Sequence, residues 1–326
     1  MRSLLKATLA TVITTSITAA SLPGFAQTDR SFPSKPVRLV AVSVGSQNDI
    51  LARLIASKMS ENWGQPVVVE NRMGAGGAIA ASVVAKAAPD GYTLLSQSAQ
   101  FAIGAALHAN LPYDPLKDFS GVTRIGFSTT AIVVAPSLGV MSVKDFIALA
   151  QARPGQIFFS SAGAGSGMHM NGERFRFSAG IKVMHVGFKG ASEALIEVMA
   201  GRVHYAVPGL GPALPLIKDG KLVALAVIAP ERSPLLPDVP AMVEALPGYE
   251  RDGSFGLLAP ARTPRPVLKQ ISNEVRRIME LPDIKERLHS MGFAPAPTTP
   301  EEHDRILRAD IETFTRIVKL AGLRVH

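Results

Sequence analysis

The sequence of 326 residues contains no cysteine, which excludes disulfide bonds, zinc ribbons, iron–sulfur clusters and thiol nucleophiles together. It is also poor in charge, because Asp, Glu, Lys and Arg make up only 18% of the residues whereas 47% are hydrophobic. No low-complexity tract is present, which argues against extensive disorder. The chain is therefore expected to be compact, stabilised by packing, and long enough for two domains.

Basic residues are in excess, but they do not form a patch along the sequence. The formal net charge is +8, and Lys and Arg are scattered singly or in pairs, with no basic run interleaved with aromatic residues. Nucleic-acid binding proteins concentrate this charge. We therefore expect no nucleic-acid partner.

The first 26 residues have the pattern of a secretory signal peptide. Arg2 and Lys6 precede an apolar stretch at 7–20, and Gly24 and Ala26 place small side chains before a cleavage site. The apolar stretch is shorter than the roughly 20 residues that span a bilayer. We expect cleavage after Ala26 and an exported protein that does not span the membrane; a buried N-terminal helix is the alternative.

From Val37 onward, short β-branched runs alternate with helical patterns, which is typical of βαβ units. The sequence therefore predicts an α/β protein with mostly parallel sheets flanked by helices. We expect strands at 37–42, 67–70, 92–95, 131–135, 157–160, 182–185, 204–207, 222–227 and 254–258. We expect helices at 49–62, 76–87, from Ser142, and at 191–200, 211–219, 264–279, 282–290 and 300–321.

This pattern restarts after residues 111–115, which suggests a second sheet. The last three helices could return to cover the first sheet. The predicted division is then a signal peptide at 1–26, a discontinuous lobe I at 27–128 plus 252–326, and a lobe II at 129–251. The chain would cross between the lobes near residues 128 and 251.

Two loops rich in small residues each follow a predicted strand and run into a predicted helix: residues 43–48 and residues 162–167. A helix N-terminus offers unpaired N–H groups and the positive end of the helix dipole, which suit a carboxylate. Ordinary tight turns are the alternative interpretation of both loops. Asp49 fits a carboxylate that complements the dipole of its own helix, with ligand contact as the alternative.

Motifs of catalysis and cofactor binding are weak. Gly74-Ala75-Gly76 lacks the third glycine of a dinucleotide fingerprint, and the seven histidines lack metal-ligand spacing. We therefore expect no cofactor and no metal. Ser166 and His169 lie close in sequence, so an exported Ser–His hydrolase remains an alternative, although no G-x-S-x-G elbow and no partner acid accompany them.

Several ordered phrases cover essentially the whole mature chain. They include Gln65-Pro66-Val67-Val68-Val69-Glu70-Asn71-Arg72, Gly74-Ala75-Gly76-Gly77, Ala88-Pro89-Asp90-Gly91-Tyr92-Thr93-Leu94-Leu95, Leu111-Pro112-Tyr113-Asp114-Pro115 and Pro237-Asp238-Val239-Pro240. Together these phrases resemble the Bug-type (TctC-like) solute receptors of tripartite tricarboxylate transporters. The resemblance implies a monomeric, periplasmic, two-lobed binding protein, not an enzyme, that closes on a small organic acid. Its partner would be a membrane transporter; a sensor or scaffold role is the alternative.

The resemblance also implies which residues bind the ligand. They are Ser43, Val44, Gly45, Ser46, Gln47, Asn48, Asp49, Ser98, Ala99, Gly163, Ala164, Gly165, Ser166, Gly167, Met168, His169 and Pro208. In this family the carboxylate is held by backbone N–H groups and waters. Pro208 stands where the family often has Asp. Together with Met168 and Phe101, Pro208 favours a less polar acid over an amino acid.

Overall fold

The computed structural model describes residues 32–42, 44–229, 231–249 and 254–323. The strands are β1 (Val37–Ala41), β2 (Val67–Asn71), β3 (Thr93–Gln97), β4 (Phe119–Ser128), β5 (Thr130–Val134), β6 (Ile157–Ser161), β7 (Val183–Gly187), β8 (Tyr205–Ala206), β9 (Val223–Ile228), β10 (Ser254–Pro260) and β11 (Phe293–Pro295). The α-helices are α1 (Gln47–Trp63), α2 (Ala78–Ala85), α3 (Ala99–Leu107), α4 (Val143–Ala152), α5 (Gly167–Ser178), α6 (Ala191–Met199), α7 (Leu210–Lys218), α8 (Met242–Ala245), α9 (Arg265–Met279), α10 (Pro282–Ser290) and α11 (Pro300–Ala321).

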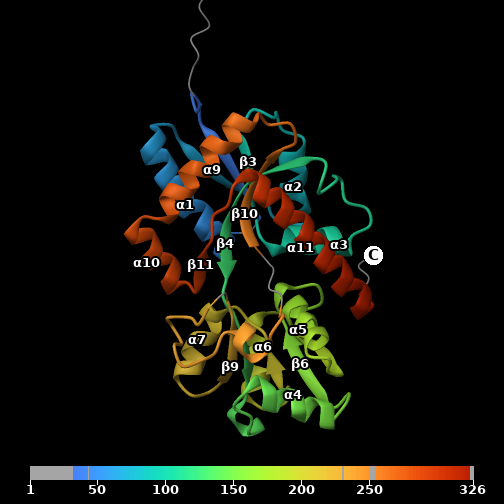
Figure 1. Cartoon of the computed structure of the whole chain (residues 1–326). Helices are drawn as coiled ribbons and strands as arrows, with labels where there is room; N and C mark the ends of the chain where they lie inside the picture. The colour runs from blue at the N-terminus through green and yellow to red at the C-terminus, as the bar shows by residue number, and fades with distance from the viewer. Residues whose placement is uncertain (1–31, 43, 230, 250–253, 324–326) are drawn as a thin grey trace, which may run out of the picture. The chain divides into compact units, whose positions relative to one another are not determined.

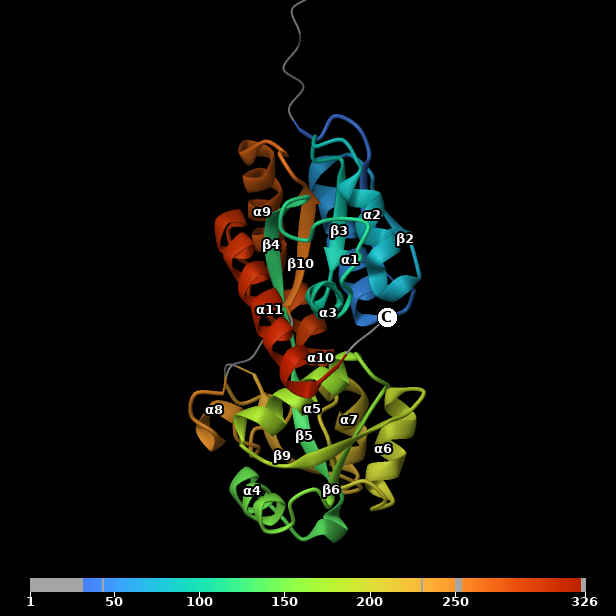
Figure 2. The ribbon, with the colours of Figure 1, turned by 90° about the vertical axis from the view of Figure 1, so that its right-hand side faces the viewer.

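The first sheet has six strands in the order β11-β4-β10-β3-β1-β2. Successive residues of a strand point to opposite faces, and both faces of this sheet are covered by helices (Figures 1 and 2). Val40 and Leu95 pack with Ala80 and Val84 of α2 and with Leu307 of α11. Helices α1 and α9 lie against the strands and against each other. This is the sheet of the predicted lobe I.

The second sheet has five strands in the order β7-β6-β8-β5-β9. Along β5, Ile132 and Val134 belong to one apolar cluster, which includes Phe146 of α4. Ala131 and Val133 belong to another, which includes Leu195 of α6 and Ala213 of α7. The alternation along a single strand thus buries both faces of the second sheet.

The prediction of an α/β architecture with two helix-flanked sheets is confirmed, and most strands of each sheet run in the same direction, although both sheets also contain antiparallel pairs. In the first sheet β1 pairs in parallel with β2 and β3, whereas β10 pairs antiparallel with β3 and β4, and β11 with β4. In the second sheet β5 runs antiparallel to β8 and β9, while β6 pairs in parallel with β7 and β8. The opposed strands include β5, by which the chain enters the second sheet, and β10, by which it returns to the first.

The elements that the sequence prediction missed are α3, β4, α8 and β11. Strand β4 contains Gly121 and Gly126, and both are required by close packing. A Cβ at Gly126 would lie 2.2 Å from the carbonyl oxygen of Ala294, and one at Gly121 would lie 2.8 Å from Oδ1 of Asp304. These glycines weaken the sequence signal of a strand that the tertiary structure needs.

The chain passes from the first sheet to the second at Thr129, between β4 and β5. The N–H of Thr129 donates to the carbonyl of Gly292 (2.8 Å), and its carbonyl accepts from the N–H of Leu210 (2.7 Å). The sequence analysis expects its first crossing near this point, at residue 128. The second expected crossing, near residue 251, lies outside the described residues, as do the predicted signal peptide and Ser43.

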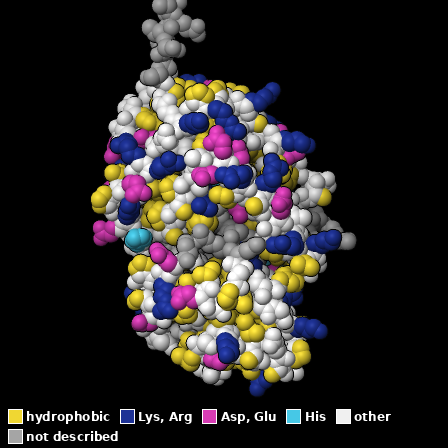
Figure 3. Space-filling view, in the orientation of Figure 1, with side chains coloured by type: hydrophobic (Ala, Val, Ile, Leu, Met, Phe, Trp, Pro, Cys, Tyr) yellow, Lys and Arg dark blue, Asp and Glu magenta, His cyan; other side chains and the backbone are white. Residues whose placement is uncertain are grey.

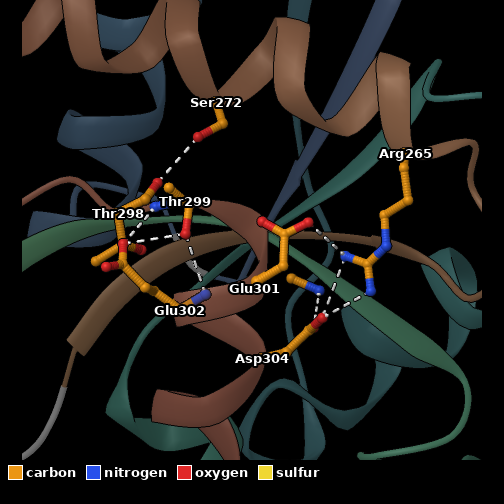
Figure 4. Close-up of polar contacts among 8 residues, drawn as sticks. Arg265, Ser272, Thr298, Thr299, Glu301, Glu302 and Asp304 are labelled. Atoms are coloured by element: carbon orange, nitrogen blue, oxygen red, sulfur yellow. Dashed lines mark hydrogen bonds and ion pairs between the residues drawn. The ribbon is translucent and has the colours of Figure 1, made fainter.

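Helix α11 is fixed to the first sheet at its N-terminus (Figure 4). Thr299 caps the helix and forms a reciprocal capping box with Glu302. Arg265 of α9 forms an ion pair with Asp304, and Ser272 donates to the carbonyl of Thr298 (2.9 Å). These contacts hold α11 in register across β4 and allow its C-terminal half to reach α3 and α5.

We predict that His303 makes the stability of the protein acid-sensitive. Its ring is fully buried, and neither ring nitrogen has a hydrogen-bond partner among the described residues. Burial, together with the nearby Arg124, lowers the pKa of His303 to about 3. Because an unfolded His takes up its proton at about 6.5, stability is lost as the pH falls from 6.5 towards 3.

The test is urea unfolding of wild type and His303→Leu at pH 7.5 and pH 5. Between pH 7.5 and pH 5, His303 alone should lower the free energy of unfolding of the wild type by about 2 kcal/mol. The decrease in the variant should be smaller by this amount. Equal losses in the two proteins would contradict the prediction.

Candidate functional site

Four helix N-termini meet at one cavity with a volume of about 250 Å³. Its lining includes Gln47, Ala99 and Gly167, the first residues of α1, α3 and α5, and Gly209, which precedes α7. Helix α1 contacts the first sheet, and α3 packs against it through Phe101, while α5 and α7 contact the second sheet. Each sheet therefore supplies two helix N-termini to the cavity.

This arrangement favours an anion. The first N–H groups of a helix have no acceptor within the helix, and the helix dipole places partial positive charge at that end. All four helices are at least nine residues long. A carboxylate between them would accept hydrogen bonds from backbone N–H groups.

The walls of the cavity are apolar and aromatic over much of their area. Ile103, Met168 and Ile228 line it together with Phe127, Phe255 and Phe314. Polar side chains are also present: Gln100, Ser128, Thr130, Asn171, Arg174 and Tyr249. The cavity thus suits an anion that carries an apolar body.

The loop before α1 is held by Asp49. Ser46 caps the helix by accepting from the N–H of Asp49 (3.2 Å), and the Asp49 carboxylate accepts from the N–H of Gly45 (3.0 Å), from Asn71 and from Arg53. Burial acts to raise the pKa of Asp49, but these hydrogen bonds outweigh it and hold the pKa below its ordinary value. Asp49 is therefore an ionised residue that positions the loop.

The loop before α5 repeats this geometry in the other lobe. Ser166 caps α5 by accepting from the N–H of His169 (3.2 Å), and Nδ1 of His169 accepts from the N–H of Gly165 (3.0 Å). The side chain at the third helical position thus bonds back to the loop in both lobes. Because His169 uses Nδ1 on Gly165 and meets Ser166 through its backbone, it is not placed to deprotonate the Ser166 hydroxyl.

A second histidine lies under the same loop. The rings of His169 and His185 are stacked with their centroids 3.7 Å apart, and Nε2 of His185 lies 2.6 Å from the hydroxyl of Ser161. Burial and the neighbouring His169 lower the pKa of His185 to about 4. His185 is therefore neutral at neutral pH and supports the loop as a packing group.

The sequence-predicted site residues fall into two groups. Gln47, Ser98, Ala99, Gly167 and Met168 line the cavity. The other described ones lie beside or beneath it: Val44, Gly45, Ser46, Asn48, Asp49, Gly163, Ala164, Gly165, Ser166, His169 and Pro208. Several of their groups are already bonded; the N–H groups of Gly45, Gly163, Gly165 and Ser166 and the carbonyl of Pro208 all have partners.

Phe101 does not line this cavity. Its ring packs against Tyr113 and Phe119 in the interior of the first lobe, with centroids 5.8 and 5.1 Å away. The aromatic walls of the cavity come instead from residues that sequence reasoning missed, such as Phe127, Phe255 and Phe314. Asn171 and Arg174 were missed too, although they lie four and seven residues after Gly167, a helical spacing that places them on its face.

Outside the cavity, other functions would show as charged patches, metal sites or membrane-spanning helices. On the face shown in Figure 3, Lys and Arg are interspersed with Asp and Glu and do not form one patch. Within the described ranges, no three potential metal-binding side chains cluster. No helix there has both the length and the apolar character needed to cross a bilayer.

The family comparison agrees with the geometry. A model of the TctC family, described as the tripartite tricarboxylate transporter family receptor, matches residues 51–323. The chain belongs to this family. Protein BugT of Bordetella pertussis is 30% identical over 299 residues, which cover 90% of this chain and 92% of BugT. The resemblance in the sequence motifs is thereby confirmed.

Two solved structures of receptor-like proteins superpose on nearly the whole chain. Rpa4515 of R. palustris, solved with adipate, has a TM-score of 0.73 and 33% identity and covers 90% of this chain and 99% of its own. MatC from Rhodopseudomonas palustris, solved with bound malate, has a TM-score of 0.68 and 30% identity over 88% and 100% of the two chains. Both share the two-lobed α/β fold, and this TctC-family chain is accordingly a solute-binding receptor of the periplasmic binding protein type.

We predict that Asn48 fixes the N-terminus of α1 relative to the N-terminus of α3 and thereby stabilises the fold. Its buried amide donates to the carbonyl of Ser96 (2.8 Å) and accepts from the Ser96 hydroxyl (2.7 Å), which ties α1 to the end of β3 just before α3. Asn48→Ala leaves both Ser96 groups buried without this partner. The free energy of unfolding should fall by about 1–3 kcal/mol.

Urea unfolding measures this loss. The control is Asn62→Ala on the same helix, where the exposed amide bonds Glu274, and the change should stay within about 0.5 kcal/mol. Equal effects of the two substitutions would contradict the assigned role of Asn48.

Proposed function

We propose that the protein is an exported receptor that captures a small carboxylate between its lobes and presents it to a tripartite tricarboxylate-type transporter. The observation that carries the proposal is the convergence of four helix N-termini on one cavity. The ligands of the two similar structures, adipate and malate, are carboxylic acids and support this ligand class. The membrane partner is inferred from the family.

The export step follows from the signal-peptide pattern. Cleavage after Ala26 would remove Arg2 and Lys6, lower the formal net charge from +8 to +6 and start the mature protein at Gln27. In our proposal the lobes are residues 27–128 with 252–326, and residues 129–251. They would move about the crossings at Thr129 and near residue 251.

Closure would be driven by the ligand. Helices α3 and α5 approach each other across the cavity, where Nε2 of Gln100 donates to the carbonyl of Gly165 (3.5 Å). A ligand shifts such an equilibrium only by its difference in affinity for the closed and open forms. A carboxylate that needs N–H groups from both lobes binds the closed form best, and that form would be the one recognised by the transporter.

A thermal-shift screen of the mature protein tests the ligand class. Mono-, di- and tricarboxylates and aromatic acids are compared with their neutral amides. An acid at about 100 times its dissociation constant should add about 2.7 kcal/mol of stability, while the matched amide should add far less. Stabilisation by neutral amides or sugars alone would overturn the proposal.

The N-terminus of α5 offers a sharper test, because proline is tolerated at the first position of a helix but lacks the N–H. Ser166, the residue before Gly167, is extended (φ −67°, ψ 156°), as proline requires of the preceding residue, and a Cβ built on Gly167 has no atom within 4 Å. Gly167→Pro should therefore fold and lose one donor to the ligand. Affinity for the acid should fall roughly 10- to 100-fold.

Gly167→Ala is the matched control, since alanine keeps the N–H. Calorimetric titration should give the alanine variant nearly wild-type affinity. If the proline variant also binds as wild type, the α5 N-terminus does not hold the ligand.

A further inference from the structure

A row of polar side chains runs along α5 on the side away from the cavity. Four residues follow one another at intervals of three or four: Ser166, His169, Glu173 and Arg176. This spacing places them on one side of the helix. Nε2 of His169 lies 3.7 Å from Oε1 of Glu173, and the guanidinium of Arg176 lies 2.6 Å from the other carboxylate oxygen. The row therefore connects the loop before α5 to an ion pair about two helical turns away.

The hydrogen bond that His169 accepts defines where its ring carries a proton. Nδ1 of His169 accepts from the N–H of Gly165 (3.0 Å), so this nitrogen has no proton and the ring is neutral. A neutral imidazole with an acceptor at Nδ1 carries its proton on Nε2, the nitrogen that faces Glu173. The tautomer inferred from this bond is thus the one that a neighbouring carboxylate stabilises.

The surroundings of the ring leave this task to Glu173. Its side chain is 4% exposed, and the charge of Arg176 is engaged with the carboxylate oxygen that does not face His169. The rings of Phe159 from β6 and His185 from β7 stack against His169, with centroids 6.0 and 3.7 Å away. Phe159 has no charge, and His185 is neutral at neutral pH. The carboxylate of Glu173 is therefore the charged group that faces Nε2.

We propose that Glu173 is a positioning residue for the ligand site and acts through His169. Its carboxylate keeps the proton on Nε2, so that Nδ1 can accept from Gly165 and hold the loop before α5. Gly163 and Gly165 have positive φ values (105° and 75°), which glycine adopts without strain, so this loop depends on hydrogen bonds to keep one conformation. The inference rests on the proposed function, because the loop affects binding only if the α5 N-terminus holds the ligand.

The substitution Glu173→Gln reverses the polarity that His169 meets. Because the guanidinium of Arg176 can only donate, it would pair with the carbonyl oxygen of the new amide and turn the amide NH₂ towards Nε2. A donor at this place favours a ring with its proton on Nδ1. The N–H of Gly165 would then lose its acceptor.

Arg176→Gln is the matched control. It removes the ion pair with Glu173 and leaves the carboxylate that faces His169. A role of Glu173 confined to the ion pair would give the two variants the same behaviour, whereas a positioning role affects His169 and Gly165 only in Glu173→Gln.

Nitrogen chemical shifts of the histidine rings report the tautomer in the ¹⁵N-labelled mature protein at pH 7.5. Wild type and Arg176→Gln should carry the proton of His169 on Nε2, and Glu173→Gln should carry it on Nδ1; the signals are assigned by their absence in His169→Gln. Exchange of the Gly165 amide with solvent should be at least about tenfold faster in Glu173→Gln than in wild type, and within about threefold of wild type in Arg176→Gln.

Calorimetric titration with adipate, with which Rpa4515 was solved, tests the link to the ligand site. Affinity for adipate should fall roughly 3- to 10-fold in Glu173→Gln and stay near the wild-type value in Arg176→Gln. Unchanged affinity in Glu173→Gln would reject the role of Glu173 in binding.

The other outcomes separate this inference from the proposed function. A wild type with the proton of His169 on Nδ1 would overturn the inference, whether or not the variants fold. Equal acceleration of Gly165 exchange in the two variants would also overturn it, because Glu173 would then act only through its ion pair. A wild type that binds neither adipate nor any acid of the thermal-shift screen would overturn the proposed function, while the tautomer and the amide exchange would still decide whether Glu173 positions the loop.

Discussion

The structure depends on an electrostatic constraint: four helix N-termini, two from each lobe, point their positive ends at one cavity. Because these partial charges have the same sign, they repel one another and disfavour approach of the lobes. An anion between them attracts both sides and so favours approach. In the proposed function, the same charges would hold the ligand and couple its binding to closure. Recognition through backbone N–H groups also leaves the side chains of the walls available to distinguish one acid from another.

The loops before α1 and α5 are held in place by the same pattern of hydrogen bonds. In each, a serine caps the helix and the side chain three residues later bonds back to a loop N–H, through Asp49 and Gly45 in one lobe and His169 and Gly165 in the other. These bonds satisfy the loop amides internally, so the N–H groups left for a ligand are those of the first helical turn. Catalysis by Ser166 and His169 finds no support in this arrangement, because His169 serves the loop.

Much of the architecture could be predicted from the sequence, because apolar runs and helical periodicity indicate most strands and helices. Strand β4 and helix α3 could not. Gly121 and Gly126 stand in β4 to admit neighbouring backbone and side chains, and α3, with Gly104 inside it, has no polar face to reveal its period. The antiparallel pairing of β5 and β10 could not be predicted either, because strand direction depends on which sheet the chain enters and not on the local pattern.

The candidate site could be predicted in outline. Small residues between a strand and a helix indicated the loops at 43–48 and 162–167, and Gln47 and Gly167 from them line the cavity. The walls could not be predicted, because Phe127, Phe255 and Phe314 come from distant parts of the chain and meet only in the folded protein. Arg174 was within reach of sequence reasoning, since it shares a helical face with Gly167.

The central claim is tested most directly by a crystal structure of the mature protein with a bound dicarboxylate. The account predicts carboxylate oxygens within about 3 Å of backbone nitrogens in the first turns of α3 and α5. A ligand seated away from those turns, or held there by side chains alone, would contradict it.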